Sequence, residues 1–445
     1  MIRAAFLLLL VACGAEAQRF QDRYCDRPER AQRGRNCGGY AFFEAFPDNG
    51  AGTTAACDGA TPTGAKGEAI SFVRATPATC LKGNTTTGIA DGELVKLTSG
   101  QPAVMPGGDG SPPNGIVFEP TRTNDCLRGE ELCNASWTDT ATCASDAVAG
   151  PFGTTTMDRL TDGSGAALQG ATQSITTNAA NKHAWSCFIK AGTATSATIS
   201  MVGAGNGTGD CSATVTGLST TTSKRVSCVS PSAYTGSLTS VTVSVLVGTV
   251  ASDTGSITVE ACQHEDTATT GVSSYIPTAG SAVTRNLTVI DFPVAAASPA
   301  AISLAATLVS PNNLYVAGGT AVPVVLGGGT VGSTSAPSPY VWLYSATSDG
   351  RLAADTSGVV SGGASIYDPF FTAFSTTTVR VAMTHTGSRL NTCQEGVCAA
   401  GTASTLGTPT FTRILLGRYS SAVANHFNGV IKKVCVDFTD SGRCL

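Results

Sequence analysis

The chain has 445 residues, and charged residues make up 13% of it, about half of the roughly 25% that is usual in soluble domains. Hydrophobic residues reach 42%, and the formal net charge is −4. A core can therefore form, which excludes a disordered charged tail, and the lack of a basic excess argues against a nucleic-acid partner. The length predicts two or three domains, whose surface is covered by small polar residues rather than by charges.

Residues 1–17 have the pattern of an export signal. The apolar run Ala4–Ala12 is too short for a membrane span of about 20 residues but suits a signal peptide. Two processing routes are open. Ala15–Ala17 forms a small-x-small cleavage site, whereas Leu10–Cys13 resembles a bacterial lipobox in which Cys13 would be lipidated. Both routes predict an exported protein, either secreted or held at the cell surface by a lipid, and no later stretch is apolar enough for a transmembrane helix.

Residues 18–66 form a Cys- and Arg-rich segment followed by a linker. Several arginines lie close to Cys25 and Cys37, and a stretch rich in Gly, Thr and Ala runs on to Lys66. We interpret the first part as a disulfide-pinned surface segment with solvated arginines. Attachment to an acidic surface polymer is the alternative.

The 16 cysteines indicate an oxidising compartment. Metal sites would need Cys-x-x-Cys or Cys-x-x-His spacing, and neither occurs. Without Cys13 the number of thiols is odd, so one thiol is free or pairs between chains. Cys393 and Cys398 flank a predicted hairpin turn closed by a disulfide, whereas the full connectivity stays open. The cysteines closest in sequence are Cys25/Cys37, Cys57/Cys80, Cys126/Cys133, Cys211/Cys228, Cys393/Cys398 and Cys435/Cys444.

From residue 67 almost to the end, the sequence predicts strands joined by turns. Apolar and polar residues alternate in Thr195–Met201, Val241–Val247, Val379–Met383 and Val430–Phe438. A period of two places one face of a strand in the core and the other in water. β-branched residues dominate these segments, and helical periodicity is absent beyond the signal. We therefore expect an all-β protein of the sandwich class.

Six short motifs follow one another between residues 67 and 285. They are Ile70–Thr76, Gly115–Asn124, Asn134–Trp137, Glu260–Glu265, Ser274–Thr278 and Val283–Arg285. In this order and spacing they resemble modules of phage-tail and surface proteins that contain a carbohydrate-binding-module-like jelly roll. The resemblance implies lead-in strands over 67–123 and the jelly roll over 124–285. Cys126, Cys133 and Cys262 depart from the family pattern, and we interpret them as disulfides added to an exported version.

Residues 286–445 contain Leu415–Arg418 followed by Phe427–Ile431. This pair of segments resembles the strands of a concanavalin A-like, or laminin-G-like, sandwich. The expected fold is therefore two β-sandwiches, a jelly roll and then a concanavalin A-like domain, after the signal peptide and the Cys/Arg-rich segment.

The usual catalytic constellations are missing from the sequence. The four histidines are scattered without metal-binding spacing, and no G-x-S-x-G motif occurs. The concanavalin A-like fold also houses glycosidases, which need two facing carboxylates. Residues 286–445 contain a single Glu, Glu395, so we expect a protein that is not an enzyme.

Aromatic residues alternate in the segment YVWLY. We hypothesise that Tyr340, Trp342 and Tyr344 line a concave sugar-binding face, because aromatic rings stack on the apolar faces of sugars. Asp368 is a candidate at its rim. The alternative is that the three aromatics belong to the core and the aliphatic residues between them face outward.

Within the predicted jelly roll, Trp137 and Trp185 are expected in the core. Gln263 and Glu265 alternate onto one face of the closing strand, where the resemblance implies a recurrent polar pair. We interpret that pair as structural hydrogen bonding rather than catalysis.

A cation is the one cofactor that the sequence suggests. Asp158 and Asp162 lie near Gly163 and could help to bind Ca²⁺, which takes carboxylate and carbonyl oxygens. No other cofactor is expected.

Two functions fit the sequence. The first is an exported, non-catalytic carbohydrate-binding or adhesive surface protein that recognises a glycan or cell-surface polysaccharide through aromatic side chains. The second is a structural or adhesive protein whose sandwiches serve as spacers or attach to a surface protein. Low charge and disulfides fit both, and a membrane is expected as a partner only through a lipid anchor.

Overall fold

The structure, a computed structural model, describes the chain most continuously between Gly115 and Ala297. All the elements that it describes are strands, and every strand pair is antiparallel, which confirms the predicted all-β sandwich class. The described residues are 41–44, 71–73, 78–81, 94–97, 104–105, 115–119, 121–177, 181–205, 209–234, 238–266, 272–297, 301–309, 321–327, 340–345, 352–355, 365–367, 378–385, 388–394, 397–398, 402–403, 411–417 and 429–437.

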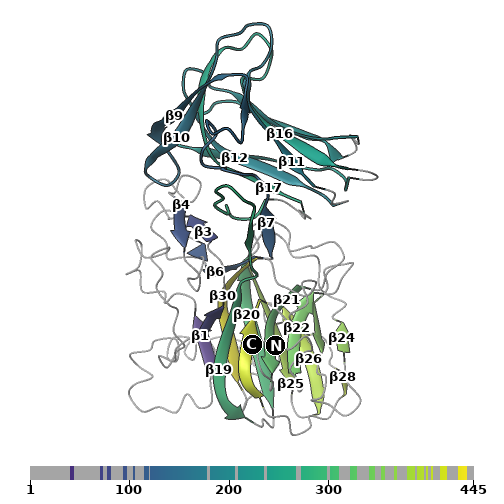
Figure 1. Ribbon diagram of the computed structural model, residues 1–445. Helices are drawn as coiled ribbons and strands as arrows, with labels where there is room; N and C mark the ends of the chain where they lie inside the picture. Colours follow the sequence, from purple (N-terminus) through teal and green to yellow (C-terminus); the bar gives the residue numbers. More distant parts are fainter. Residues whose placement is uncertain are drawn as a thin grey trace, which may run out of the picture.

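The first sandwich is the jelly roll in the upper part of Figure 1. One of its sheets has the strand order β15-β12-β17-β10-β9, and the other has the order β14-β13-β16-β11-β8. The strands are β8 (Thr138–Asp139), β9 (Thr142–Ala149), β10 (Thr155–Asp162), β11 (Gly170–Thr176), β12 (Ala184–Ala191), β13 (Ala197–Gly203), β14 (Cys211–Val215), β15 (Lys224–Val229), β16 (Ser240–Val247) and β17 (Gly255–Glu265).

Alternation builds the core of this sandwich. Val241, Val243, Val245 and Val247 on β16 are all fully buried, while the residues between them are not. Trp137 and Trp185 lie in the same core with ring centroids 6.2 Å apart. Both tryptophans are therefore core residues, as the sequence predicts.

The second sandwich lies below the first in Figure 1. Its larger sheet contains the path β27-β26-β25-β20-β30-β6-β5, with β1 on β30 and β28 on β26, and its smaller sheet has the order β2-β19-β29-β21-β22-β23-β24. The strands after the jelly roll are β19 (Val289–Ala297), β20 (Ile302–Val309), β21 (Ala321–Gly327), β22 (Tyr340–Ser345), β23 (Leu352–Asp355), β24 (Ser365–Tyr367), β25 (Thr378–His385), β26 (Arg389–Gln394), β27 (Val397–Cys398), β28 (Thr402–Ala403), β29 (Phe411–Leu416) and β30 (Gly429–Asp437).

Strands from before the jelly roll complete both sheets of the second sandwich. They are β1 (Ala41–Glu44), β2 (Ser71–Val73), β5 (Val104–Met105) and β6 (Gly115–Phe118), whereas β3 (Ala78–Leu81) and β4 (Leu94–Leu97) pair only with each other. The segments 18–66 and 67–123 thus supply strands to the second sandwich instead of leading only into the jelly roll. The jelly roll is inserted into that sandwich.

The insertion is joined to its host by a two-stranded ribbon. β7 (Arg122–Asn124) carries the chain into the jelly roll and pairs with β18 (Val283–Arg285), which carries it out. The hydroxyl oxygens of Thr123 and Thr284 lie 2.9 Å apart across the ribbon. The incoming and outgoing segments therefore lie side by side.

Three disulfides cross-link the jelly roll. They join Cys133 to Cys143, Cys187 to Cys262 and Cys211 to Cys228. In the second sandwich, Cys393 is disulfide-bonded and lies opposite Cys398 across the β26–β27 hairpin. These bonds are consistent with an oxidising, extracellular environment.

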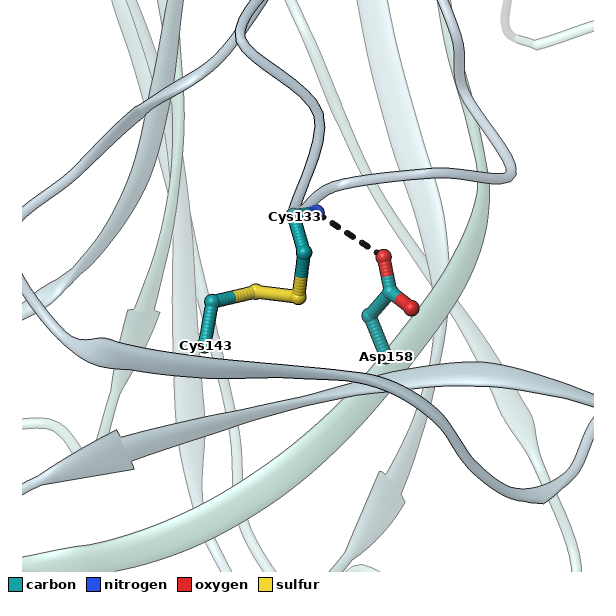
Figure 2. Close-up of side chains that lie close together, drawn as sticks. All are labelled: Cys133, Cys143 and Asp158. Carbon is teal, nitrogen blue, oxygen red and sulfur yellow. Dashed lines mark hydrogen bonds between the residues drawn. A yellow bond between two sulfur atoms is a disulfide. The ribbon is translucent and has the colours of Figure 1, made fainter.

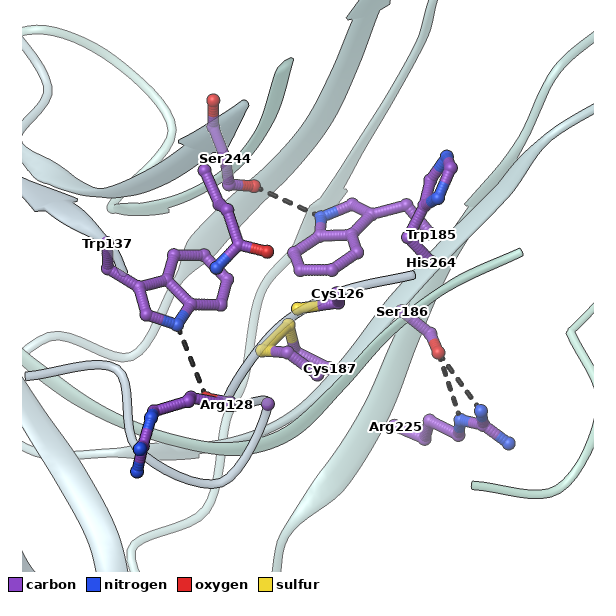
Figure 3. The surroundings of a disulfide bond; sticks show 12 residues. Cys126, Arg128, Trp137, Trp185, Ser186, Cys187, Arg225, Ser244 and His264 are labelled. Carbon is purple, nitrogen blue, oxygen red and sulfur yellow. Dashed lines mark hydrogen bonds between the residues drawn. A yellow bond between two sulfur atoms is a disulfide. The ribbon is translucent and has the colours of Figure 1, made fainter. Parts of the chain in front are cut away.

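Cys126 and Cys133 are close in sequence but do not pair. Cys126 is a free, fully buried thiol, and burial raises its pKa well above the usual value. Figure 3 shows it near the disulfide of Cys187, between Trp137 and Trp185. The interpretation of Cys126 as part of an added disulfide is therefore wrong, whereas Cys133 and Cys262 do form disulfides.

Within the described residues, no helix is long and apolar enough to cross a membrane.

Candidate functional site

Buried and partly buried charges gather where the β7–β18 ribbon meets the last part of β17. We call this group the junction cluster. Its charged members come from the incoming segment, the jelly-roll sheet and the outgoing segment, and they are Glu119, Arg122, Arg225, Glu265 and Arg285.

Glu119 and Arg285 form the central ion pair of the junction cluster. Arg285 Nη1 lies 3.0 Å from Glu119 Oε2, and the Arg285 side chain is fully buried. The N–H of Ser274 donates to Glu119 Oε1 and its hydroxyl donates to Oε2, each over 2.6 Å. Arg285 also donates to the backbone oxygen of Ser274 over 3.1 Å. Burial alone would raise the pKa of Glu119, but Arg285 and the Ser274 hydrogen bonds outweigh it and lower that pKa.

Glu265 is the second buried carboxylate of the junction cluster. Its Oε1 accepts hydrogen bonds from the N–H and the hydroxyl of Ser273, each over 2.9 Å, and also one from the Gln263 amide. Arg122 Nε lies 3.4 Å from Glu265 Oε2. Arg225 donates to the backbone oxygen of Ser273 over 2.7 Å and to the hydroxyl of Ser186, as Figure 3 shows. Gln263 and Glu265 thus take part in structural hydrogen bonding.

Asn124 completes the network without a charge. Its Oδ1 accepts the N–H of Cys126 over 3.1 Å and the N–H of His264 over 3.0 Å, while its Nδ2 donates to the oxygen of Ile276 over 2.8 Å. Glu119, Arg122 and Asn124 all belong to the segment Gly115–Asn124. The polar residues of this motif therefore hold the joint between the two sandwiches together, because their side chains bind other groups of the protein.

A β-bulge determines which residues of β17 face the core. Ala261 has a φ of 54°, and the register with β12 shifts at this point. Cys262 and His264, beyond the shift, face the core, whereas Glu260 before the shift and Gln263 beyond it both lie on the outward side of the sheet. The alternation of the sequence does not reveal this change of face.

Glu260 is the most unusual carboxylate of the described residues. It is 0% exposed, and neither of its oxygens has a hydrogen-bond partner of good geometry. Burial raises its pKa from 4.5 to about 7, although the hydroxyl of Thr156 acts in the opposite direction. The neighbouring Lys190 is occupied by the backbone oxygen of Ala149, 2.6 Å from its Nζ. The Glu260 carboxyl group therefore keeps its proton to a higher pH than an ordinary glutamate does.

Asp158 and Asp162 are not brought together in the structure. They lie four residues apart on β10, a separation of about 13 Å along a strand. Asp158 accepts the N–H groups of Cys133 and Asp146, and Asp162 accepts those of Ser164 and Gln169. Each carboxylate is therefore engaged with its own loop, and the Ca²⁺ prediction stays a prediction.

One group of possible metal ligands occurs among the described residues. Cys133, Cys143 and Asp158 offer ligand atoms within 4.8 Å of one another. Figure 2 shows that the two cysteines form a disulfide and that Asp158 accepts the Cys133 N–H. Disulfide sulfurs lack the thiolate that binds a metal, so this group does not fit a metal ion.

Two of the histidines that are scattered in the sequence meet in the jelly roll. His183 Nδ1 lies 3.1 Å from His264 Nε2, and both side chains are fully buried. Asp125 Oδ2 lies 3.6 Å from His264 Nδ1. Sequence reasoning missed this pair because 81 residues separate its members, which approach only through the pairing of β12 with β17. Its burial keeps a substrate away.

The aromatic segment forms β22 in the smaller sheet of the second sandwich. Trp342 lies opposite Val325 on β21 and Asp355 on β23. By register, the face that includes Trp342 carries the polar and aromatic residues Ser71, Asp291, Tyr340, Tyr344, Asp355, Ser365, Tyr367 and Arg413, and also the apolar residues Val73, Val289, Pro293, Val325, Ala353 and Leu415. The opposite face carries Phe72, Ile290, Phe292, Val324, Leu326, Leu343, Ala354, Ile366, Ile414 and Leu416.

The two faces of this sheet differ in polarity. Ile290, Ile414 and Leu416 on the apolar face are buried, as expected for the face that packs in a sandwich. The aromatic residues share the other, more polar face. Leu415 also lies on that face and is buried, so the part near β29 is covered. Asp368 and Cys13 lie outside the described residues.

No family model and no curated protein matches the sequence. Among solved structures, the chain resembles the CBM40 of Ruminococcus gnavus IT-sialidase bound to α2,6 sialyllactose, with 16% identity over 31% of this chain and 75% of that chain and a TM-score of 0.23. It also resembles domain 4 of the Geobacillus stearothermophilus arabinanase AbnA in complex with arabinotriose, with 12% identity over 38% of this chain and 76% of that chain and a TM-score of 0.23. Mouse laminin α1 domains LG4-5 share 10% identity over 72% of this chain and 93% of that chain, with a TM-score of 0.23. Likeness at this level assigns no ligand, and the sandwich class rests on the strand pairing itself.

Removal of Arg285 should destabilise the protein strongly. In Arg285→Met, Glu119 would stay buried without its counter-charge, and we expect a loss of about 3–5 kcal/mol in the free energy of unfolding. Urea unfolding followed by circular dichroism measures it. The control is Arg128→Met, which removes the exposed Arg128–Glu131 pair and should cost less than about 1 kcal/mol. Equal losses in the two variants would show that the buried pair has no special role.

Glu260 should make the stability depend on pH. Its pKa is raised on folding, so its contribution is fully present below pH 4.5 and is lost as the pH rises to about 7. Relative to Glu260→Gln, the wild type should lose about 3 kcal/mol between pH 4.5 and pH 8. Unfolding at a series of pH values tests this, with the exposed Glu131→Gln as control. Parallel curves for wild type and Glu260→Gln would contradict the assignment.

Proposed function

We propose that the protein is an exported, non-catalytic glycan-binding protein whose binding residues include Tyr340, Trp342 and Tyr344. The observation that carries this proposal is the register of the smaller sheet of the second sandwich. By register, the three aromatics share a face with Asp355 and other polar residues as well as with Val325, whereas the aliphatic residues of β22 share the opposite, more apolar face. This placement supports the binding hypothesis over the alternative that the aromatics belong to the core.

The chemistry of this face suits a sugar. Aromatic rings bury the apolar faces of sugar rings, and tyrosine adds a polar tip. Asp355, Tyr367 and Arg413 on the same face offer hydrogen-bond partners that would orient hydroxyl groups. Asp368 follows β24 directly in sequence and is a further candidate at the rim.

The absence of catalysis is part of the proposal. Among the described residues, the carboxylates and histidines with unusual surroundings, Glu119, Glu260, Glu265, His183 and His264, are buried against protein groups. A glycosidase instead needs two carboxylates that flank an accessible glycosidic bond. Incubation with the bound oligosaccharide should therefore release no reducing sugar.

A rigid spacer is the second candidate function. The junction cluster fixes the β7–β18 ribbon against the jelly roll, and the disulfides reinforce the inserted domain. Such a joint suits a protein that holds a partner at a set distance from a surface. Under this alternative, the sandwiches bind a surface protein instead of a glycan.

Replacement of Trp342 distinguishes the two functions. We expect Trp342→Ala to lose the glycans that the wild type retains on a glycan array, whereas Trp342→Phe should keep most of the stacking and most of the binding. Near-ultraviolet circular dichroism and melting verify that both variants are folded. A wild type that binds no glycan and self-associates would favour the spacer, and a folded Trp342→Ala protein that retains the same oligosaccharides of the array as the wild type, with unchanged affinity, would refute the role of this face.

Export can be tested directly at the mature N-terminus. The proposal predicts that intact-protein mass spectrometry finds either a lipidated Cys13 or a chain that begins at Gln18. Both products place the protein outside the cytoplasm, secreted or anchored at the cell surface. A mature chain that begins at Met1 would refute both routes.

A further inference from the structure

The outward face of one jelly-roll sheet bears hydroxyl groups almost exclusively. We call it the hydroxyl face. Its members, by strand, are Thr138 on β8; Gly170, Thr172, Ser174 and Thr176 on β11; Ser240, Thr242, Ser244 and Leu246 on β16; Thr198, Ser200 and Val202 on β13; and Ser212 and Thr214 on β14. All but three of these residues are Ser or Thr, and none is charged.

The hydroxyl groups are in register across the sheet. Thr138, Thr172, Ser244, Ser200 and Ser212 each lie directly opposite the next one on the adjacent strand. Neighbouring strands are about 4.8 Å apart, so this row of five hydroxyl groups is about 19 Å long. A second row, Ser174 and Thr242 with Val202, runs beside it.

The hydroxyl face is open to solvent. Ser174, Thr176, Thr242, Ser212 and Thr214 are exposed, and the central residues of the row are partly exposed, whereas the residues that alternate with them are in the core. Three of the hydroxyl groups donate to backbone oxygens: Thr172 to Thr138, Ser212 to Ile199, and the buried Thr198 to Gly248. The oxygen atoms of the Thr172 and Ser212 hydroxyl groups can still accept hydrogen bonds from a ligand.

The hydroxyl face differs from the outward side of the other jelly-roll sheet in its lack of charged residues. The outward side of the other jelly-roll sheet carries Arg159, Lys190, Arg225 and Glu260. Charged residues make up 13% of the whole chain, and the hydroxyl face has none. The outward side of one sheet is therefore charged and that of the other is an uncharged array of hydroxyl groups, with the exposed Asp139 on β8 as the charged residue in the strands of that second sheet.

We propose that the hydroxyl face binds an uncharged polysaccharide that lies across the strands. Each Ser or Thr hydroxyl both donates and accepts, as does each hydroxyl of a sugar, so a repeating chain of sugars can pair with a repeating row of side chains. No ion must be stripped of water on binding, and short side chains lose little conformational freedom. An acidic polymer would find no cation here, which restricts the ligand to a neutral one.

This surface is independent of the aromatic face. It lies in the inserted jelly roll, whereas Trp342 lies in the second sandwich. The experiment therefore uses the full chain with Trp342→Ala, so that the aromatic face does not contribute. Co-sedimentation with cellulose, chitin and insoluble β-1,3-glucan measures neutral binding, and binding to alginate measures affinity for an acidic polymer.

In that background, the variant Thr172→Val/Ser200→Ala/Ser244→Ala removes three hydroxyl groups of the row while it preserves shape. We expect retention on the neutral polysaccharide to fall by about tenfold to a hundredfold, as three lost hydrogen bonds imply. Ser200→Glu should abolish retention, because it places a charge in the middle of the row. The matched control is Ser227→Glu, which changes an exposed serine on β15, outside the hydroxyl face, and should leave retention unchanged.

Several results would overturn the proposal. One is a Trp342→Ala chain that no longer binds any neutral polysaccharide that the wild type binds, since that result would assign all binding to the aromatic face. Another is equal loss in Ser200→Glu and Ser227→Glu. Preferential binding to alginate, or binding to ice crystals without binding to any polysaccharide, would assign the face to a different ligand. Melting of each variant verifies the fold, and the shape-preserving variant keeps the test valid if Ser200→Glu is unstable.

Discussion

The buried ion pair between Glu119 and Arg285 is the interaction on which the arrangement of the two sandwiches depends. Its members come from the segments that enter and leave the jelly roll, and Ser274 binds both of them. A buried pair of this kind adds little net stability by itself, because both charges lose their hydration. It does exclude alternatives, because any arrangement that separates the segments leaves an uncompensated charge inside the protein. The ion pair therefore determines how the two segments are arranged and adds little to the free energy of unfolding.

The sequence predicted the strands well and their assembly less well. The alternating valines of β16 determine a half-buried strand by local spacing alone, and the burial of Trp137 and Trp185 follows from their size and apolarity. The insertion of the jelly roll could not be seen in the same way. Pairing of β2 with β19 and of β6 with β30 joins residues hundreds of positions apart, and no local pattern specifies a partner at that distance.

The same distinction holds for the candidate sites. Alternation placed Tyr340, Trp342 and Tyr344 on one face of a strand, but the residues that share this face, such as Val325 on β21 and Asp355 on β23, are known only from the strand pairing. The bulge at Ala261 moves Glu260 and Gln263 to one side in a way that a strict period of two does not allow. The His183–His264 pair and the Cys133–Cys143 disulfide likewise arise from tertiary approach. The motif Gly115–Asn124 was recognised by its letters, yet its physical purpose became clear only when Glu119, Arg122 and Asn124 met their partners.

The ribbon of β7 and β18 has a mechanical consequence. Because β1 pairs with β30, strands from near the two ends of the chain belong to one sheet of the second sandwich, and the jelly roll branches from that sandwich as a side arm. A pulling force applied between β1 and β30 would act first on the hydrogen bonds that join these two strands. It would not act on the jelly roll. A pull on a ligand held by the jelly roll would instead load both strands of the ribbon together, at the point where Glu119 and Arg285 hold it. The two halves of the protein would therefore respond to different directions of force.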